Sequence, residues 1–208
     1  MGDKEKAVSC TKLNLTKAIA MWEADEKNEG KKISEQEDVD LIFRSIDNLD
    51  TSINTLTNCR LLSLSSNLII RIPELNLPRL ERLSLGRNRI KKISGLSFVA
   101  PTLKQLWISY NEITSLEGIK ECLKLEILYI GNNNIASINE LNVIEKLDQI
   151  TDVVFKNNPF ALDGGDVKKP VEKSIHEIVP LVYAKIPSLV KYDGELVADI
   201  MNEVNDQK

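Results

Sequence analysis

The chain has 208 residues, of which 42% are hydrophobic and 28% charged, and its formal net charge at pH 7 is −4. This size fits one domain with or without extensions, and a slightly acidic chain is not typical of a general nucleic-acid binder. No apolar run approaches the roughly 18 residues of a spanning helix, and the N-terminus lacks the apolar core of a signal peptide. We therefore expect neither nucleic acid nor a membrane as a partner.

Residues 1–45 are expected to form an N-terminal cap made of a helix and a polar connection. Apolar side chains at helical spacing predict an amphipathic helix that ends before Gly30: Leu13, Leu15, Ala18, Ile19 and Trp22. The charged stretch 23–38 is typical of a solvated connection. The apolar pattern resumes at Val39, and residues 49–56 resemble half of the repeat described next, with spacing too loose for a full unit.

Residues 46–162 contain a recurring phrase, L-x-x-L-x-L-x-x-N, at 80–88, 103–111 and 125–133. Its asparagines, with one earlier unit, are spaced 21, 23 and 22 residues apart: Asn67, Asn88, Asn111 and Asn133. At six fixed offsets from each asparagine (−8, −5, −3, +2, +5 and +8) every residue is apolar. This pattern is the signature of a leucine-rich repeat, and a weaker fifth unit is anchored on Asn158.

The repeat predicts an α/β leucine-rich repeat solenoid, with short parallel strands on its concave face and helical or irregular convex segments, capped by helices at both ends. The asparagines are expected to bond backbone groups of neighbouring turns as a ladder, because buried unpaired peptide groups would cost about 1–3 kcal/mol each. Three cysteines do not make a disulfide framework. Cys59 and Cys122 fall on core positions, which predicts buried thiols and reducing surroundings.

Residues 163–208 are expected to form the C-terminal cap. The run 186–194 resembles the segment that often closes such an array. A terminal helix with one apolar face follows, carrying Leu196, Val197, Ile200, Met201 and Val204.

The outward strand positions of the repeats are the candidate binding surface, and several of them are apolar where a polar surface was expected. Trp107 and Tyr129 share one offset in adjacent units, which predicts that they stand about one strand spacing apart, roughly 5 Å. Exposed apolar patches usually mark protein interfaces. The predicted partner-binding residues are Trp107, Tyr129, Leu61, Ile127, Val154 and Arg82. The alternative is that an end segment folds over this face and covers it.

Basic residues concentrate in the first two repeats anchored on asparagine. Stacking is expected to bring them onto one edge: Arg71, Arg79, Arg82, Arg87, Arg89, Lys91 and Lys92. Of these, Arg87, Arg89, Lys91 and Lys92 are candidate contacts to an acidic partner, such as an acidic protein tail or a tubulin surface. The alternative is a solvated surface that Glu74 and Glu81 balance.

Catalytic and metal-binding patterns are missing from the sequence. His176 is the one histidine, is expected to lie in a helix and has no Cys or Ser partner by motif, so a structural or surface role is expected. Gly164-Gly165 lacks the rest of a phosphate-binding loop, and no Cys/His spacing suits zinc. We therefore expect a non-enzymatic protein without a cofactor or metal.

The central repeats are more specific than the general signature. The phrases LSLGRNRIKKI (83–93) and TLKQLWISYNEI (102–113), with SLEGI (115–119) and LYI (128–130), closely resemble the axonemal outer-arm dynein light chain 1 family. The likeness extends more loosely to Lys17–Trp22 and to 189–194. It implies a non-catalytic subunit that binds a dynein heavy chain, in its motor or microtubule-binding region, within the axoneme, a cytoskeletal and cytoplasmic location. It also implies control of motor activity or microtubule affinity, tubulin as a second partner, and an apolar sheet patch that matches Trp107 and Tyr129.

Two features depart from that family. Residues 164–169 form an unusual insertion. The terminal helix is acidic here, with Glu195, Asp199, Glu203 and Asp206 and no arginine, whereas the family's helix is basic. Two alternative functions share the same repeat class, a regulatory subunit of a protein phosphatase and a ribonucleoprotein scaffold. The first would need more repeats than the five or six found here, and net acidity speaks against the second.

Overall fold

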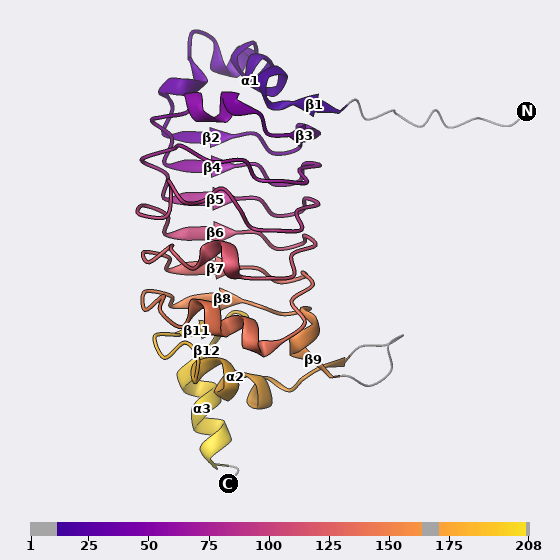
Figure 1. The fold of residues 1–208 in the computed structure, drawn as a ribbon, viewed down its shortest axis with the longest axis vertical. Helices are drawn as coiled ribbons and strands as arrows, with labels where there is room; N and C mark the ends of the chain where they lie inside the picture. Colours follow the sequence, from indigo (N-terminus) through magenta and orange to yellow (C-terminus); the bar gives the residue numbers. More distant parts are fainter. Residues whose placement is uncertain (1–11, 164–170, 207–208) are drawn as a thin grey trace, which may run out of the picture.

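The computed structural model describes residues 12–163 and 171–206 and shows an elongated stack of repeat units (Figure 1). Its main sheet has eight strands in the order β12-β11-β8-β7-β6-β5-β4-β2. All neighbours pair in parallel except β11 and β12, which are antiparallel. The expected leucine-rich repeat solenoid is therefore confirmed.

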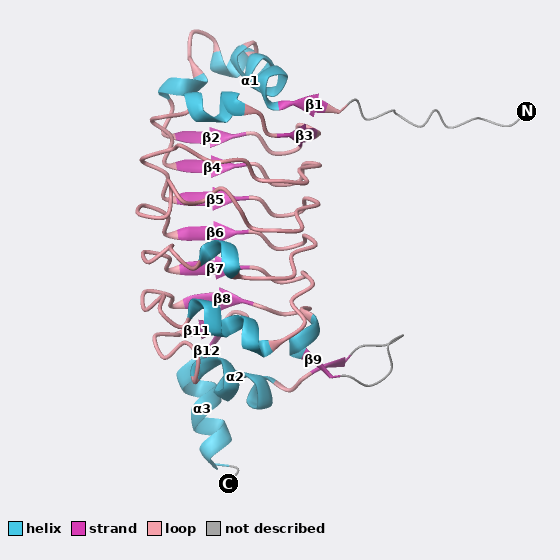
Figure 2. Cartoon of the chain, in the orientation of Figure 1, coloured by secondary structure: helices cyan, strands magenta, loops and turns pink. Residues whose placement is uncertain are grey.

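The strands of the main sheet are short, and loops and 3-10 turns fill most of the remaining chain (Figure 2). Their bounds are β2 (Asp38–Asp40), β4 (Leu61–Ser63), β5 (Arg82–Ser84), β6 (Gln105–Trp107), β7 (Ile127–Tyr129), β8 (Asp152–Val154), β11 (Lys191–Tyr192) and β12 (Glu195–Leu196). The 3-10 turns are η1 (Glu26–Asn28), η2 (Ile33–Glu35), η3 (Thr51–Thr55), η4 (Glu117–Ile119), η5 (Ile138–Ile144) and η6 (Pro159–Ala161).

The apolar positions of the repeat form the core. Side chains of a strand alternate between its two faces, so the middle residue of each strand points inward while its neighbours point out. Leu62, Leu83, Leu106, Leu128 and Val153 are at most 1% exposed. Of the 24 apolar positions in the four main units, all are buried except one, at the start of η5, which is partly buried and packs against the core: Ile138.

The asparagine ladder is confirmed, and Asn111 shows its pattern. Asn111 Oδ1 accepts from the Ile90 N–H at 2.9 Å, and its Nδ2 donates to the Leu85 and Ile108 carbonyls at 3.0 Å each. Asn133 and Asn158 repeat these bonds one unit further on. Each side chain thus bonds backbone groups of its own unit and of the preceding one, inside the core.

The residue before each anchor position has a positive φ, because the chain must turn sharply as it leaves the strand. The six residues are Phe43 (56°), Ser66 (55°), Arg87 (55°), Tyr110 (59°), Asn132 (55°) and Asn157 (58°). This left-handed conformation suits glycine and asparagine and costs other L-residues about 1 kcal/mol or more. The fold therefore imposes a conformation at this position that Phe43, Arg87 and Tyr110 adopt at a cost.

The N-terminal end holds one more unit than the asparagine pattern indicated. Strand β2 lies beside β4, and Arg44 occupies the position that asparagine holds in later units. The segment 49–56, taken as half a repeat, contains η3 and belongs to the convex part of this full unit. Its turn is bonded by the next asparagine, since Asn67 Oδ1 accepts from the N–H groups of Arg44 and Ile46 at 3.0 Å each.

Helix α1 (Leu15–Glu23) covers the N-terminal end of the stack (Figure 1). It begins after β1 (Leu13–Asn14), which pairs with β3 (Ile46–Asn48), and Asn14 caps it by accepting from the Lys17 N–H at 3.1 Å. The helix buries Leu15, Ala18 and Trp22 and partly buries Ile19, as its spacing predicted, but Leu13, also expected in the helix, lies in β1. The following stretch is more ordered than the solvated connection we expected from its charge, because η1 and η2 form there and Ile33 is buried.

Two helices close the C-terminal end, the one expected around His176 and the expected terminal helix, although Leu196, predicted to lie in the terminal helix, belongs to β12. They are α2 (Ile175–Tyr183), which follows the small hairpin of β9 (Leu162–Asp163) and β10 (Val171–Glu172), and α3 (Val197–Asp206). His176 lies at the start of α2, and its Nε2 is 2.6 Å from Glu203 Oε2 on α3. The insertion expected at 164–169 lies outside the described residues. The division at 45/46 and 162/163 stays a prediction, but both end segments add strands to the main sheet.

Candidate functional site

The two aromatic side chains of the concave face stand side by side, as their shared offset predicted. Strands β6 and β7 pair in register with Trp107 opposite Tyr129. Their ring centroids are 5.9 Å apart and their planes differ by 16°, which is a stacked arrangement. Both side chains are half-buried, so each ring still presents surface to a partner.

A basic side chain extends this stack on one flank. The Arg82 guanidinium lies 4.9 Å from the centre of the Trp107 ring, and Arg82 Nε donates to Gln105 Oε1 at 2.6 Å. The contact with the ring is a cation–π interaction, which holds the arginine in place. Arg82 forms no ion pair with any described residue, and Trp107 Nε1 is buried without a hydrogen-bond partner among them.

An acidic side chain lies on the other flank. The Tyr129 hydroxyl donates to Asp152 Oδ2 at 3.0 Å. Partial burial, and then the hydrogen bond and the negative charge of Asp152, raise the pKa of the Tyr129 phenol above its ordinary value. At neutral pH the hydroxyl is therefore protonated and Asp152 is its acceptor, so the aromatic pair has a positive flank at Arg82 and a negative flank at Asp152.

The other predicted patch residues do not form one apolar surface. Val154 is next to Tyr129 in the same row, and Ile127 begins the strand that Tyr129 ends. Leu61 is two strands away from Gln105, with Arg82 between them. It lines a small hollow of about 140 Å³ together with Arg82 and Trp107. The patch is therefore an aromatic centre with apolar residues on one side and this hollow on the other.

The end caps leave this face open within the described residues. Helix α1 lies at one end of the stack, and α2 and α3 lie at the other, beyond β8 (Figure 1). Helix α1 packs against β1, β3 and nearby turns, and α3 packs against α2 and β12. The sequence left open whether an end segment covers this face. Within residues 12–163 and 171–206, no end segment does.

The basic residues do not all lie on one edge, contrary to expectation. Arg82 is on the concave face, and Arg79 is at the N-terminal ends of the strands, where it pairs with Glu37 at 2.9 Å. Arg87, Arg89 and Lys91 follow the end of β5, at the opposite edge. The stack separates residues that are close in sequence because each unit passes from one edge, across the sheet, to the other.

The acidic residues also do not balance these cations in the way that the alternative interpretation expected. Glu81 pairs with Arg60 at 2.7 Å and Lys104 at 3.3 Å, at the edge away from Arg87. Lys91 pairs with Glu112 at 3.7 Å. Arg71, Arg87, Arg89 and Lys92 form no ion pair within the part of the chain that the structure describes.

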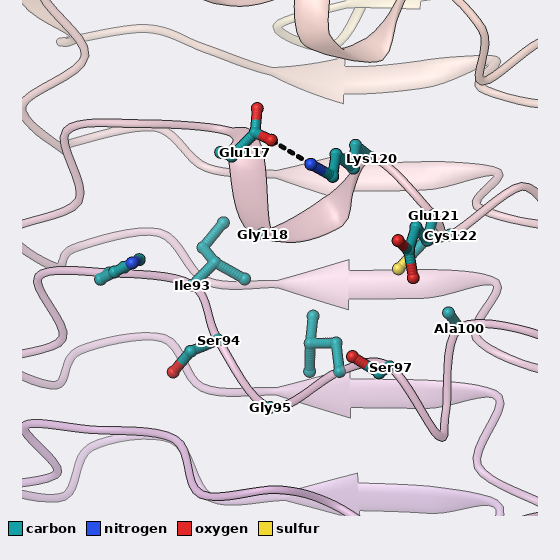
Figure 3. A pocket seen from close by; sticks show the side chains of 12 residues that line it. Ile93, Ser94, Gly95, Ser97, Ala100, Glu117, Gly118, Lys120, Glu121 and Cys122 are labelled. Atoms are coloured by element: carbon teal, nitrogen blue, oxygen red, sulfur yellow. Dashed lines mark hydrogen bonds and ion pairs between the residues drawn. The ribbon is translucent and has the colours of Figure 1, made fainter.

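A second hollow lies on the convex side, between the units anchored on Asn88 and Asn111 (Figure 3). It measures about 230 Å³ and is lined in part by Ile93, Gly118 and Cys122. The charged side chains Glu117 and Lys120 at this hollow pair with each other. A Cβ on Gly118 would meet the Ile93 carbonyl oxygen at 2.2 Å, so glycine is required where these units approach. We regard the hollow as a packing feature and the concave face as the stronger candidate site.

The two thiols among the described residues, Cys59 and Cys122, are in settings that suppress nucleophilic chemistry. Burial raises the pKa of Cys59 to about 12 and that of Cys122 to about 11. Both thiols are therefore protonated near neutral pH, and the thiolate is the reactive form.

The described residues contain no cluster of His, Cys, Asp or Glu suited to a metal ion. Within the same residues, none of the helices has the length and apolarity to cross a bilayer.

Sequence reasoning missed three exposed apolar side chains at the edge where the strands end. The exposed fractions are 79% for Phe43, 55% for Ile70 and 47% for Tyr110. Tyr110 and Arg87 form a second cation–π pair, with the guanidinium 4.4 Å from the ring centre. A signal was available, because Arg87 and Tyr110 each directly precede an anchor asparagine.

Comparison with known proteins agrees with the repeat assignment. The family described as leucine-rich repeats (2 copies) matches residues 57–97 and 101–143. Among solved structures, the Drosophila melanogaster SNF/U2A' complex aligns over 70% of this chain and 84% of the other, with a TM-score of 0.53 and 20% identity. An internalin C2 from Listeria monocytogenes aligns over 71% of this chain and 60% of the other, with a TM-score of 0.53 and 24% identity. These likenesses show the fold alone.

Relatives with higher identity identify the family. Dynein axonemal light chain 1 of Chlamydomonas reinhardtii is 38% identical over 77% of this chain and 80% of its own length. The Mus musculus protein of the same name is 42% identical over 86% of this chain and 90% of its own length. The Xenopus laevis protein is 36% identical over 93% and 96%. With its repeats, its sheet and these relatives in agreement, the chain belongs to the axonemal dynein light chain 1 family.

Proposed function

We propose that this protein is a non-catalytic light chain that docks its concave sheet onto a dynein heavy chain, near the microtubule-binding region. Family membership supports a dynein partner and a place in the axoneme of a cilium or flagellum. The observation that carries the docking proposal is the open stacked pair of Trp107 and Tyr129. Tryptophan and tyrosine are the residues most enriched among energetically dominant interface positions.

The site is organised before a partner arrives. Stacking and the bond to Asp152 fix Tyr129, and Arg82 is fixed by Gln105 and the indole ring. Side chains that are already ordered lose little conformational entropy on binding, so more of their contact energy contributes to affinity. The opposite charges of Arg82 and Asp152 on the two flanks favour one orientation of the partner.

Modulation of the motor is the finer part of the proposal. A light chain beside the track-binding tip adds bulk and charge there, which alters the motor's affinity for microtubules. Arg87, Arg89, Lys91 and Lys92 are the candidate contacts to the heavy chain or to tubulin. The acidic helix α3 is a less suitable contact for an acidic tubulin surface, because Asp199, Glu203 and Asp206 lie along it.

The test of the partner is a pull-down from ciliary extract with the wild-type protein and a Trp107→Ala, Tyr129→Ala double variant. We expect mass spectrometry to find a dynein heavy chain with the wild type and to lose it with the variant. A heavy chain retained by both proteins would place the interface elsewhere. A phosphatase or spliceosomal proteins in its place would overturn the proposal.

The test of the site is the affinity for a purified heavy-chain fragment that contains the microtubule-binding region. Trp107→Ala should weaken binding by about 2 kcal/mol or more, roughly 30-fold, because it removes the centre of the patch. Phe98→Ala is the matched control, since Phe98 is 61% exposed and lies outside the sheet. Equal affinity of all three proteins, with unchanged circular dichroism, would contradict docking through this face.

A further inference from the structure

The two edges of the main sheet use their basic residues differently. We call the edge at the N-terminal ends of the strands the return edge, defined by Glu37, Arg60, Arg79, Glu81 and Lys104. Its basic residues are paired: Arg60 and Lys104 with Glu81, and Arg79 with Glu37. The pairs of Glu81 link successive units, and the pair of Arg79 with Glu37 spans the unit between them, so these three basic residues already have partners within the molecule.

We call the edge to which the strand arrows point in Figure 1 the turn edge, defined by Phe43, Ile70, Arg71, Arg87, Arg89 and Tyr110. Arg71, Arg87 and Arg89 pair with no acidic group of the described chain. The arginine density is part of a wider pattern. Residues 41–120 carry 11 Lys and Arg against 6 Asp and Glu, a net charge of +5 in a chain whose total is −4.

Exposed apolar side chains accompany these arginines. Phe43, Ile70 and Tyr110 belong to three different units and are all about half exposed or more. A single exposed apolar residue needs no explanation, but three of them at one edge, beside unpaired cations, are typical of an interaction surface. Arg87 stacks on Tyr110, which holds both side chains in place at this edge.

The backbone shows that the fold does not need these large side chains. Phe43, Arg87 and Tyr110 occupy the position that has a positive φ in every unit. Asn132 and Asn157 fill the same position in later units, with a residue that adopts this conformation readily. Large residues at this position are unfavourable for the backbone. Because their side chains are exposed, they also bury little apolar surface that could offset this cost, so folding alone does not account for them.

We propose that the turn edge is a second docking surface, separate from the concave patch, for an acidic segment of a partner polypeptide that carries aromatic or aliphatic side chains; this rests on the contact role proposed above for Arg87 and Arg89 and names the chemistry of the partner. The unpaired arginines complement carboxylates, and Phe43, Ile70 and Tyr110 contact the apolar side chains between them. A polypeptide fits better than a nucleic acid. Residues 121–208 carry 15 Asp and Glu against 9 Lys and Arg, so a long phosphate backbone would meet repulsion beyond these units.

The probes that test this proposal are a glutamate-rich peptide containing phenylalanine and leucine, the same peptide with serine at those positions, and oligouridylate. Fluorescence anisotropy gives the affinity of each for the full chain. We expect the apolar-bearing peptide to bind about tenfold tighter than the serine peptide, and oligouridylate to bind most weakly. Equal binding of the two peptides, or tighter binding of oligouridylate, would overturn the proposal.

Variants separate a docking role from a structural one. Phe43→Asn with Tyr110→Asn should abolish the difference between the two peptides, while the melting temperature rises. Arg87→Gln with Arg89→Gln should weaken both peptides. Trp107→Ala should leave all peptide affinities unchanged, which keeps this surface distinct from the concave site. A fall in melting temperature of the asparagine variant would show that the aromatics serve the fold, and loss of peptide binding in Trp107→Ala would move the site.

Discussion

The two edges of the sheet are held together by different forces. At the turn edge, buried asparagine amides bond backbone groups of successive units; Asn133 is 4% exposed and Asn158 is fully buried. At the return edge, side-chain ion pairs in water join the units, with exposed fractions of 29% to 54% in the pairs of Glu37, Arg60, Arg79 and Glu81. Both arrangements repeat from unit to unit, but solvent weakens the exposed ion pairs more than the buried hydrogen bonds.

The difference explains why the turn edge can be specialised for binding. Its stability comes from groups inside the core, so its outer side chains are not needed to join the units. The outer side chains of the return edge do join units, because their charges pair between different units of the stack. Burial makes a hydrogen bond costly to lose, whereas exposed ion pairs contribute little on average.

The largest effect should follow from breaking the ladder with Asn111→Ala. The Leu85 and Ile108 carbonyls keep a second donor, from Asn88 and Asn133, but the Ile90 N–H loses its acceptor inside the core. We expect the free energy of unfolding to fall by roughly 2–3 kcal/mol, the cost of a buried unpaired group. Urea unfolding followed by circular dichroism measures it.

Arg44→Ala is the control for that experiment. Arg44 occupies the anchor position of the first unit, which has no preceding unit for its side chain to bond. We expect a change within about 0.5 kcal/mol, as for an ordinary surface position. A loss as large as that of Asn111→Ala would show that the ladder's contribution does not come from bonds between units.

A smaller effect should follow from placing a large residue on the turn edge. Asn132→Phe puts phenylalanine at a position with φ of 55°, which asparagine tolerates and phenylalanine does not. We expect the free energy of unfolding to fall by about 1 kcal/mol. Phe43→Asn makes the reverse change and should raise the melting temperature by about 2–4 °C. Differential scanning calorimetry checks both, and equal melting temperatures of all three proteins would refute the backbone argument.

The smallest effect should come from the return edge, with Glu81→Gln. Hydrogen bonds from Arg60 and Lys104 lower the pKa of the Glu81 carboxyl below its ordinary value. Because the folded-state pKa is the lower one, this stabilisation is present above the unfolded value and disappears as the pH falls through the folded value. We expect the wild type to lose its advantage over the variant in that acidic range and in high salt, by thermal melting. An advantage unchanged by both would show that charge pairing is not its cause.

Most of the fold could be predicted because each repeat encodes the same buried positions. The extra N-terminal unit could not, since Arg44 replaces the asparagine by which units were recognised. That asparagine is dispensable at the first unit because the next one, Asn67, bonds its turn. A helix around His176 was expected, but its packing against the terminal helix was not, because that contact joins two separate segments of the chain.

The candidate site could be predicted in part. The shared offset of Trp107 and Tyr129 placed them together, because parallel strands in register bring equal offsets face to face. The flanking charges could not be anticipated in the same way, since the contacts of Arg82 with Trp107 and of Tyr129 with Asp152 join different units. The predicted basic edge was wrong for Arg79, which lies at the return edge, and for Arg82, which lies on the concave face, because neighbours in sequence were treated as neighbours in space.

The sequence by itself determined the repeat, the inward and outward positions, the asparagine ladder and the family, because each depends on a residue type at a fixed spacing. Only the tertiary structure decided which cations are paired, which faces remain open beside the caps, and which large side chains occupy the left-handed turn position. Those properties depend on distances between units, and a linear pattern does not contain them until the units are stacked.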